Sequence, residues 1–147
     1  MAARIRDALA DLDPSGAEHY ARGYEAFVAK LDALDREIRR LLTGLSGRRF
    51  MVFHPAWGYF ADTYGLVQVP VERGGKEPGA RTLAALIEQA RRDDVRVIFV
   101  KPQFGERSAA RLAEAIGGRV VSVDPLAADY LDNLRYAARQ IAAALKP

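Results

Sequence analysis

Three residues with ionisable side chains occur in the same local setting. His54, Lys101 and Asp124 each follow a short apolar run, and a proline follows each of them. The carboxyl ends of all strands in an open parallel sheet lie at one edge, where ligands bind, so we expect these three residues at a common rim. An imidazole can act as a general base, and a carboxylate can orient it. The pattern leaves open a small hydrolase or lyase that uses His54 and Asp124.

Each of these residues also has a simpler explanation. Asp is a favoured N-cap and Pro a favoured first helical residue, so Asp124-Pro125 would be expected at a helix start without any function. Lys101 is explained as a solvated charge at the rim, and a single His such as His54 is commonly a surface or hydrogen-bonded core residue. His19 lies early in a helical segment, where we expect it to be solvated or to serve packing.

The segments that carry these residues alternate between strand and helix patterns. Runs rich in β-branched and aromatic residues predict strands over 49–53, 66–71, 95–100 and 119–123, and the segments between and after them predict helices over 56–63, 80–92, 105–116 and 126–145. Alternating strands and helices require crossover connections. We therefore predict an α/β fold, a four-stranded parallel sheet with helices on both faces. The Gly- and Pro-rich segment 70–80 is predicted to be a mobile surface loop.

A long amphipathic helix is predicted before the sheet. Apolar residues recur at intervals of three and four from position 17 to 45, and Gly44 and Gly47 lie where such a helix should end. A shorter helix, roughly 2–10, precedes it. The expected organisation is a short N-terminal helix over 1–12, a long helix over 13–46 and an α/β lobe over 47–147.

Composition excludes several classes of function. The 147 residues suit one domain, and 22 Lys and Arg against 19 Asp and Glu leave a net charge of +3, too small to indicate nucleic acid binding. The chain has no cysteine, which excludes disulfides and thiolate metal sites. No apolar run approaches the ~20 residues that span a bilayer. The charged start of the chain predicts no export signal.

Common catalytic and nucleotide-binding motifs do not match. Gly75-Lys76 is followed by Glu77, so the phosphate-binding loop pattern is incomplete, and no G-x-G-x-x-G occurs. The four serines, Ser15, Ser46, Ser108 and Ser122, all lack the G-x-S-x-G setting of a nucleophile. These motifs therefore give no support for an enzyme, and the hydrolase or lyase that would use His54 and Asp124 stays an alternative.

Three segments together resemble a known family. They read FMVFHPAWGYFADTYGL, GKEPGARTLAALIEQARRDDVRVIFVKPQF and IGGRVVSVDPLAADYLDNL. In this order they resemble the carboxyl-terminal half of the zinc-type (ZnuA-like, TroA-like) solute-binding proteins of bacterial ABC importers. In that family two α/β lobes are joined by one long helix, and a transition-metal dication lies between the lobes. The helix over 13–46 resembles that bridging helix.

The resemblance implies metal ligands. Matched motif to motif, His54 falls on the first ligand of the carboxyl-terminal lobe and Asp124 on the second. Manganese-type members tend to carry a carboxylate at the first of these positions, and imidazole suits zinc, so the resemblance favours zinc, with manganese or another divalent transition metal as the alternative. Members often have Glu or Gln where Lys101 stands, and we expect its ammonium to point away from both ligands.

The resemblance also implies partners and a location. They are a divalent metal ion, an amino-terminal lobe that this chain lacks, an ABC permease, and a periplasmic or extracytoplasmic setting. Zinc prefers four ligands, so we expect two to bind it weakly and a second copy to be able to complete the site. The remaining alternative to a receptor is an interaction module whose exposed long helix pairs with another chain through its apolar stripe.

Overall fold

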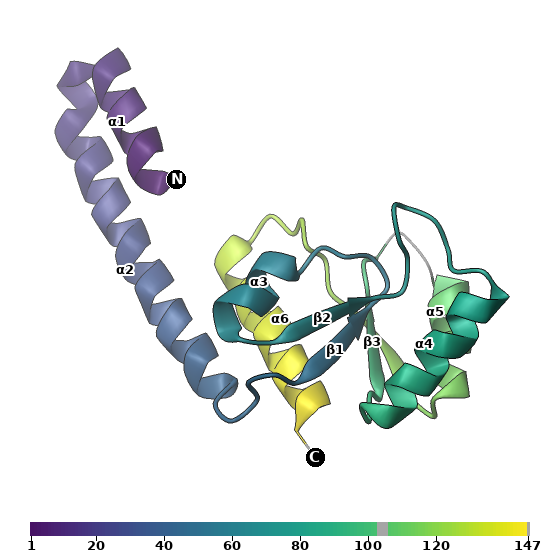
Figure 1. Cartoon of the computed structure of the whole chain (residues 1–147). Helices are drawn as coiled ribbons and strands as arrows, with labels where there is room; N and C mark the ends of the chain where they lie inside the picture. Colours follow the sequence, from purple (N-terminus) through teal and green to yellow (C-terminus); the bar gives the residue numbers. More distant parts are fainter. Residues whose placement is uncertain (103–105, 147) are drawn as a thin grey trace. The chain divides into compact units, whose positions relative to one another are not determined.

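The structure is a computed structural model that describes residues 1–102 and 106–146. Its helices and strands follow the predicted alternation (Figure 1). The elements in chain order are α1 (Ala2–Leu12), the short 3-10 helix η1 (Pro14–Gly16), α2 (Ala17–Leu41), β1 (Arg49–Val52), α3 (Gly58–Tyr64), β2 (Val67–Pro70), α4 (Ala80–Arg92), β3 (Val97–Val100), α5 (Glu106–Ala115), β4 (Arg119–Ser122) and α6 (Tyr130–Leu145). They form two compact units, Met1–Glu37 and the residues from Ile38 onward.

The first unit is a helical hairpin in which α1 packs beside the first turns of α2 (Figure 1). Its turn is organised by Asp13, whose Oδ1 accepts hydrogen bonds from the Ser15 hydroxyl at 2.5 Å and the Gly16 amide at 3.2 Å. The other carboxylate oxygen accepts from the Tyr20 hydroxyl at 2.9 Å. A capping carboxylate at a helix start satisfies amides that have no partner inside the helix.

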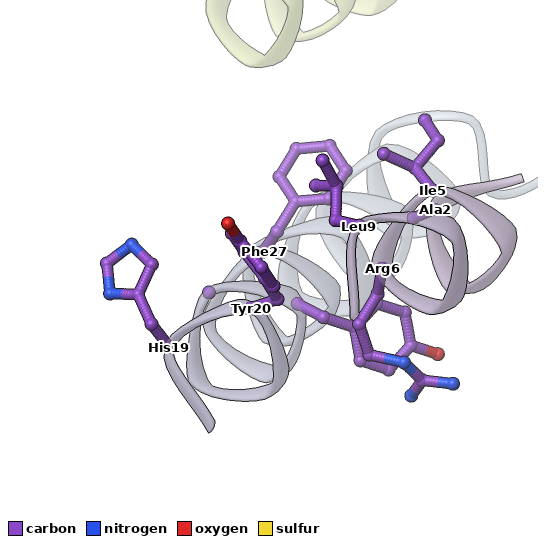
Figure 2. Close-up of a pocket in the computed structure, with 9 residues that line it drawn as sticks. Ala2, Ile5, Arg6, Leu9, His19, Tyr20 and Phe27 are labelled. Carbon is purple, nitrogen blue, oxygen red and sulfur yellow. The ribbon is translucent and has the colours of Figure 1, made fainter. Parts of the chain in front are cut away.

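The hairpin leaves part of its apolar surface exposed. Ile5 is 56% exposed and Leu12 84%. Apolar side chains of both helices line an open groove of about 280 Å³, where Leu9 and Phe27 face each other (Figure 2). His19 lies at its margin and is exposed, as expected from the sequence.

The second unit is built on one parallel sheet in the order β2-β1-β3-β4. The register places Val52, Phe99 and Val121 in one row across β1, β3 and β4. Helices α4 and α5 cover one face of the sheet, and α3 and α6 cover the other (Figure 1). The predicted fold class, a four-stranded parallel sheet with helices on both faces, is therefore confirmed.

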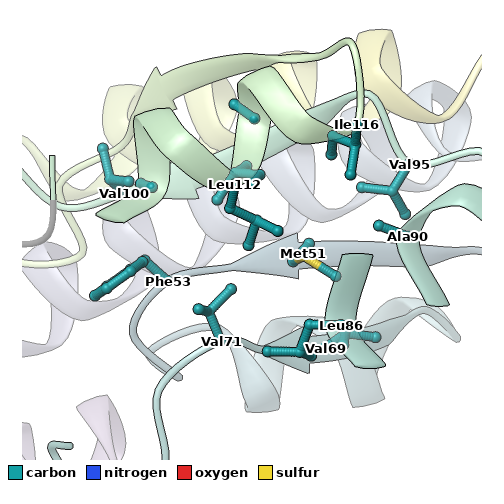
Figure 3. Packing of buried hydrophobic residues seen from close by; sticks show 13 residues of the cluster. Met51, Phe53, Val69, Val71, Leu86, Ala90, Val95, Val100, Leu112 and Ile116 are labelled. Carbon is teal, nitrogen blue, oxygen red and sulfur yellow. The ribbon is translucent and has the colours of Figure 1, made fainter. Parts of the chain in front are cut away.

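The main core fills the space between the sheet and helices α4 and α5. Alternate strand residues point to that face, among them Met51 and Ile98, and they pack against Leu86, Ala90 and Leu112 (Figure 3). The opposite face has its own core, in which the rings of Phe50 and Phe99 meet edge to face at 6.2 Å. Burial of both faces explains why the central strands β1 and β3 are mostly apolar runs, whereas the edge strands β2 and β4 include exposed residues.

Several boundaries differ from the sequence predictions, two of them by four residues. The long helix was expected to reach residue 45 but ends at Leu41, because Gly44 takes a left-handed conformation with φ 78° and reverses the chain. The last helix was expected from residue 126 but begins at Tyr130. The helix predicted over 105–116 is α5, and its expected first residue lies outside the described part of the chain.

The predicted loop 70–80 begins too early. Pro70 is the last residue of β2, and Val71 is 2% exposed in the core. The ladder continues beyond the strand, because the Val71 and Glu72 amides donate to Val52 and Phe53 at 2.9 and 3.0 Å. The loop itself is a tight turn at Gly74 and Gly75, which both have positive φ.

Among the described residues, none of the helices has the length and apolar character needed to cross a membrane.

Candidate metal centre

His54 lies at the carboxyl end of β1, as predicted. The Phe53 amide donates to the Phe99 carbonyl at 2.8 Å, so the strand pairing continues to the residue before the histidine. Pro55 follows and cannot donate an amide to a continuing ladder, so the chain leaves the sheet here. The imidazole is 39% exposed, which leaves it accessible from solvent.

The nearest polar partner of His54 is Glu72, a residue that the sequence predictions missed. Its Oε1 forms a hydrogen bond with Nδ1 of His54. The Glu72 side chain is only 12% exposed. Glu72 follows the end of β2 as His54 follows the end of β1, and this position was the available signal. It was lost because Glu72 was assigned to the surface loop.

Asp124 lies at the same sheet edge, beyond β4. The Val123 amide donates to the Val100 carbonyl at 2.8 Å, which keeps the residue before Asp124 in the ladder. The Asp124 Oδ1 accepts from the Leu126 amide at 2.9 Å, and its backbone carbonyl accepts from the Asn133 side chain at 2.7 Å. These bonds hold the turn and leave Oδ2 as a further acceptor.

The explanation of Asp124 as the cap of the last helix is wrong in detail. The N-cap of α6 is Asp129, whose carboxylate accepts from the Asp132 amide at 3.2 Å. Asp124 instead stabilises a turn that precedes the helix. Its place at the sheet edge is thus not explained by helix capping.

The sheet register relates the two candidate ligands. Val52 and Val121 belong to the same row of the sheet. His54 lies two residues beyond Val52 along the chain, and Asp124 lies three residues beyond Val121. Only β3 separates their strands, so β1 and β4 lie about 10 Å apart at the ~4.8 Å spacing of neighbouring strands. Lys101 follows β3 between them and is half-buried. The direction of its ammonium stays a prediction.

The aromatic residues after His54 differ in their burial. Trp57 and Phe60 are buried, each 8% exposed, with their rings edge to face at 6.0 Å. The Trp57 amide also donates to the Gln68 side chain at 2.7 Å, which ties this segment to β2. Tyr59, in contrast, is 93% exposed and points away from this packing.

The described residues contain no group of three or more His, Cys, Asp or Glu side chains arranged to hold a metal ion. The hydrolase alternative required Asp124 to orient the imidazole of His54. The structure gives the contact with Nδ1 to Glu72 instead.

Comparisons with known proteins identify the architecture. A zinc uptake protein of Brucella abortus, the high-affinity zinc uptake system protein ZnuA, is 30% identical over 138 residues, which cover 90% of this chain and 40% of that protein. A crystal structure of ZnuA superposes with a TM-score of 0.93 and 42% identity, covering 97% of this chain and 56% of the other. A zinc-bound deletion mutant of ZnuA superposes with a TM-score of 0.91 and 41% identity, covering 97% and 55%.

The chain therefore spans about half the length of the proteins it matches. Residues 1–144 match the family model ZnuA, described as zinc-uptake complex component A, periplasmic. The resemblance predicted from the sequence motifs is confirmed, and the chain belongs to the ZnuA family of metal-binding solute-binding proteins of ABC importers.

Proposed function

We propose that this chain binds zinc at the carboxyl edge of its sheet through His54 and Asp124, as part of a receptor that supplies a metal importer. The observation that carries the proposal is the shared sheet edge. The two residues are 70 positions apart in the sequence, 124 minus 54. They nevertheless follow strands β1 and β4 at the same edge of the sheet, with only β3 between those strands. An imidazole and a carboxylate reaching toward each other can span about 10 Å with an ion between them, since each metal bond adds ~2 Å.

The donor chemistry favours zinc over manganese. Imidazole nitrogen suits zinc, whereas manganese prefers carboxylate, carbonyl and water oxygens. The relatives support this choice, because the Brucella abortus protein is a zinc uptake protein and a similar ZnuA structure holds zinc. Zinc is the cargo in this proposal, so no catalysis is involved.

Two ligands predict a modest affinity. A structural zinc site contributes about 10–16 kcal/mol at neutral pH. If two of four ligands keep about half of this, roughly 5–8 kcal/mol, the dissociation constant is on the order of 1–100 μM. Tighter binding by a receptor would need further ligands from another lobe.

The part of the relatives that this chain does not cover would supply that lobe. In the proposed arrangement the helix over 13–46 bridges the two lobes, and the lobe over 47–147 contributes two of the ligands. Zinc capture would bring both lobes onto the ion, and the loaded receptor would release it to an ABC permease. The setting is periplasmic or extracytoplasmic, as the family description indicates.

Calorimetric titration with zinc tests the ligand assignment. We expect binding at micromolar affinity, and at least tenfold weaker binding in His54→Ala and in Asp124→Ala, because each variant removes one of two ligands. His19→Ala is the matched control, since His19 is exposed in the other unit. Unchanged affinity in the His54 and Asp124 double variant, with an intact thermal transition, would refute the assignment.

A further inference from the structure

We infer that Glu72 is a positioning residue for the metal site: it fixes the tautomer and the ring orientation of His54, so that Nε2 presents its lone pair to the ion. This inference rests on the proposed function, because it assigns a task to the histidine proposed as a ligand. The observation behind it is the hydrogen bond between Glu72 Oε1 and His54 Nδ1.

The backbone holds Glu72 in place beside His54. The Glu72 amide donates to the Phe53 carbonyl at 3.0 Å, which continues the pairing of β2 with β1 by one residue past each strand. Val71, directly before it, is buried in the main core. The carboxylate is therefore attached to a residue that still pairs with the sheet, and the turn at Gly74 and Gly75 begins only beyond it.

Burial makes this contact selective. The Glu72 side chain is 12% exposed and the imidazole 39% exposed, so the carboxylate is largely shielded from water while part of the ring is accessible. A hydrogen bond with an ionised acceptor is roughly twice as strong as one between neutral groups, and it strengthens where water is excluded. The exposed part of the imidazole remains accessible to a metal ion.

The chemistry of the pair determines which nitrogen is free. An ionised carboxylate only accepts hydrogen bonds, so Nδ1 of His54 must carry the hydrogen in this contact. In a neutral imidazole the lone pair is then on Nε2. A free imidazole side chain in water favours the other tautomer, with hydrogen on Nε2, which must change before that nitrogen can bind an ion. Glu72 removes this step and restricts rotation of the ring.

The second candidate ligand lies on the opposite side of His54. Strand β2, which carries Glu72, pairs with one edge of β1, whereas β3 and β4 lie at its other edge, with Asp124 beyond β4. An imidazole held by Glu72 through Nδ1 therefore has its partner carboxylates on two sides, one to orient it and one to share the ion. In this arrangement Glu72 orients the imidazole and does not bind the ion, so it is not a third ligand.

Nitrogen-15 NMR of the metal-free protein at pH 8 tests the inference without any metal. We expect the wild-type His54 ring to carry hydrogen on Nδ1 and none on Nε2. Glu72→Ala should shift the population to the Nε2-protonated tautomer, and Glu72→Gln should restore the wild-type pattern, because its amide oxygen still accepts from Nδ1. Glu77→Ala is the control, since Glu77 lies in the loop that follows Glu72 and accepts a hydrogen bond from the Ser108 hydroxyl instead. A wild-type ring with hydrogen on Nε2 would overturn the inference.

Zinc titration of the same variants completes the test. We expect Glu72→Ala to weaken zinc binding about 10–100-fold, the usual effect of losing a partner that orients a ligand, with Glu72→Gln recovering most of it. Thermal unfolding of each variant excludes a general loss of structure. A tautomer shift without any change in zinc affinity, in a protein where His54→Ala abolishes binding, would contradict the positioning role. If His54→Ala leaves zinc binding unchanged while Glu72→Ala shifts the tautomer of His54, the proposed zinc site is refuted. The hydrogen bond between Glu72 and His54 would then be real but unrelated to zinc.

Discussion

At the scale of single residues, the carboxylates of this chain act through their hydrogen bonds. Glu72 contacts the ring of His54, Asp124 closes a turn onto the Leu126 amide, and Asp13 caps the turn between α1 and α2. Asp13 and Asp124 form hydrogen bonds with residues a few positions away in the sequence. Glu72 contacts a residue 18 positions away, so no local motif identifies its contact with the histidine.

Asp13 gives a prediction about acid stability. The hydrogen bond from the Ser15 hydroxyl, followed by that from the Tyr20 hydroxyl, lowers the pKa of Asp13 below its usual value of 3.8. A lowered pKa in the folded state adds stability that is present above pH 3.8 and is lost as the pH falls through the folded pKa. The protection factors for amide exchange in the first turn of α2, which correct for the intrinsic pH dependence of exchange, should therefore fall below about pH 4.

Asp13→Asn provides the matched variant for this measurement. Its amide oxygen still accepts from the Gly16 amide, but the side chain has no charge to lose. The protection factors in the turn should depend less on pH between 5 and 2 than in the wild type. The same pH dependence in both proteins would show that another group controls the turn.

At the scale of elements, the close approach of β4 to β3 depends on Gly118. A Cβ added there would lie 2.4 Å from the Arg96 carbonyl oxygen, which accepts from the Arg119 amide at 2.9 Å. This neighbour is backbone and cannot turn away. Gly118→Ala should lower the free energy of unfolding by about 1–3 kcal/mol, measured by denaturant titration.

Gly23 in α2 is the contrasting position. A Cβ added there meets nothing within 4 Å, and the residue lies inside a helix. Gly23→Ala should stabilise that helix by about 0.5–1 kcal/mol, because alanine loses less backbone entropy on folding. Equal effects of the two substitutions would mean that the approach of β4 to β3 does not limit residue size at Gly118.

The central strands could be predicted because both of their faces are buried, which makes β1 and β3 mostly apolar runs. The helical pattern was equally clear for α4, which spans the predicted residues 80–92. The start of α6 was missed because Asp124-Pro125 has the residue types of a helix start, whereas the turn at Leu126 delays the helix to the cap at Asp129. Glu72 was missed because Gly and Pro nearby suggested a loop, although the ladder extends through it.

At the scale of the whole molecule, the chain presents two sites that could lead to association. One is the proposed pair of zinc ligands, and the other is the exposed apolar groove of the hairpin between α1 and α2. Since zinc prefers four ligands and the pair supplies two, a second copy could complete the coordination of the same ion. We expect association of this chain to depend on zinc.

Size-exclusion chromatography with light scattering separates the two routes. Zinc should convert part of the wild-type protein to a dimer at concentrations above its affinity, and a chelator should reverse this. His54→Ala should remain monomeric with zinc. A dimer that persists in chelator, and that Phe27→Ser dissociates, would indicate association through the hairpin groove instead.

The most direct test of the central claim is a crystal of this chain grown with zinc, measured on both sides of the zinc absorption edge. We predict an anomalous peak within about 2.0–2.2 Å of Nε2 of His54 and of a carboxylate oxygen of Asp124, with Glu72 still on Nδ1. Zinc bound elsewhere, with His54 and Asp124 on separate ions or on none, would contradict the account.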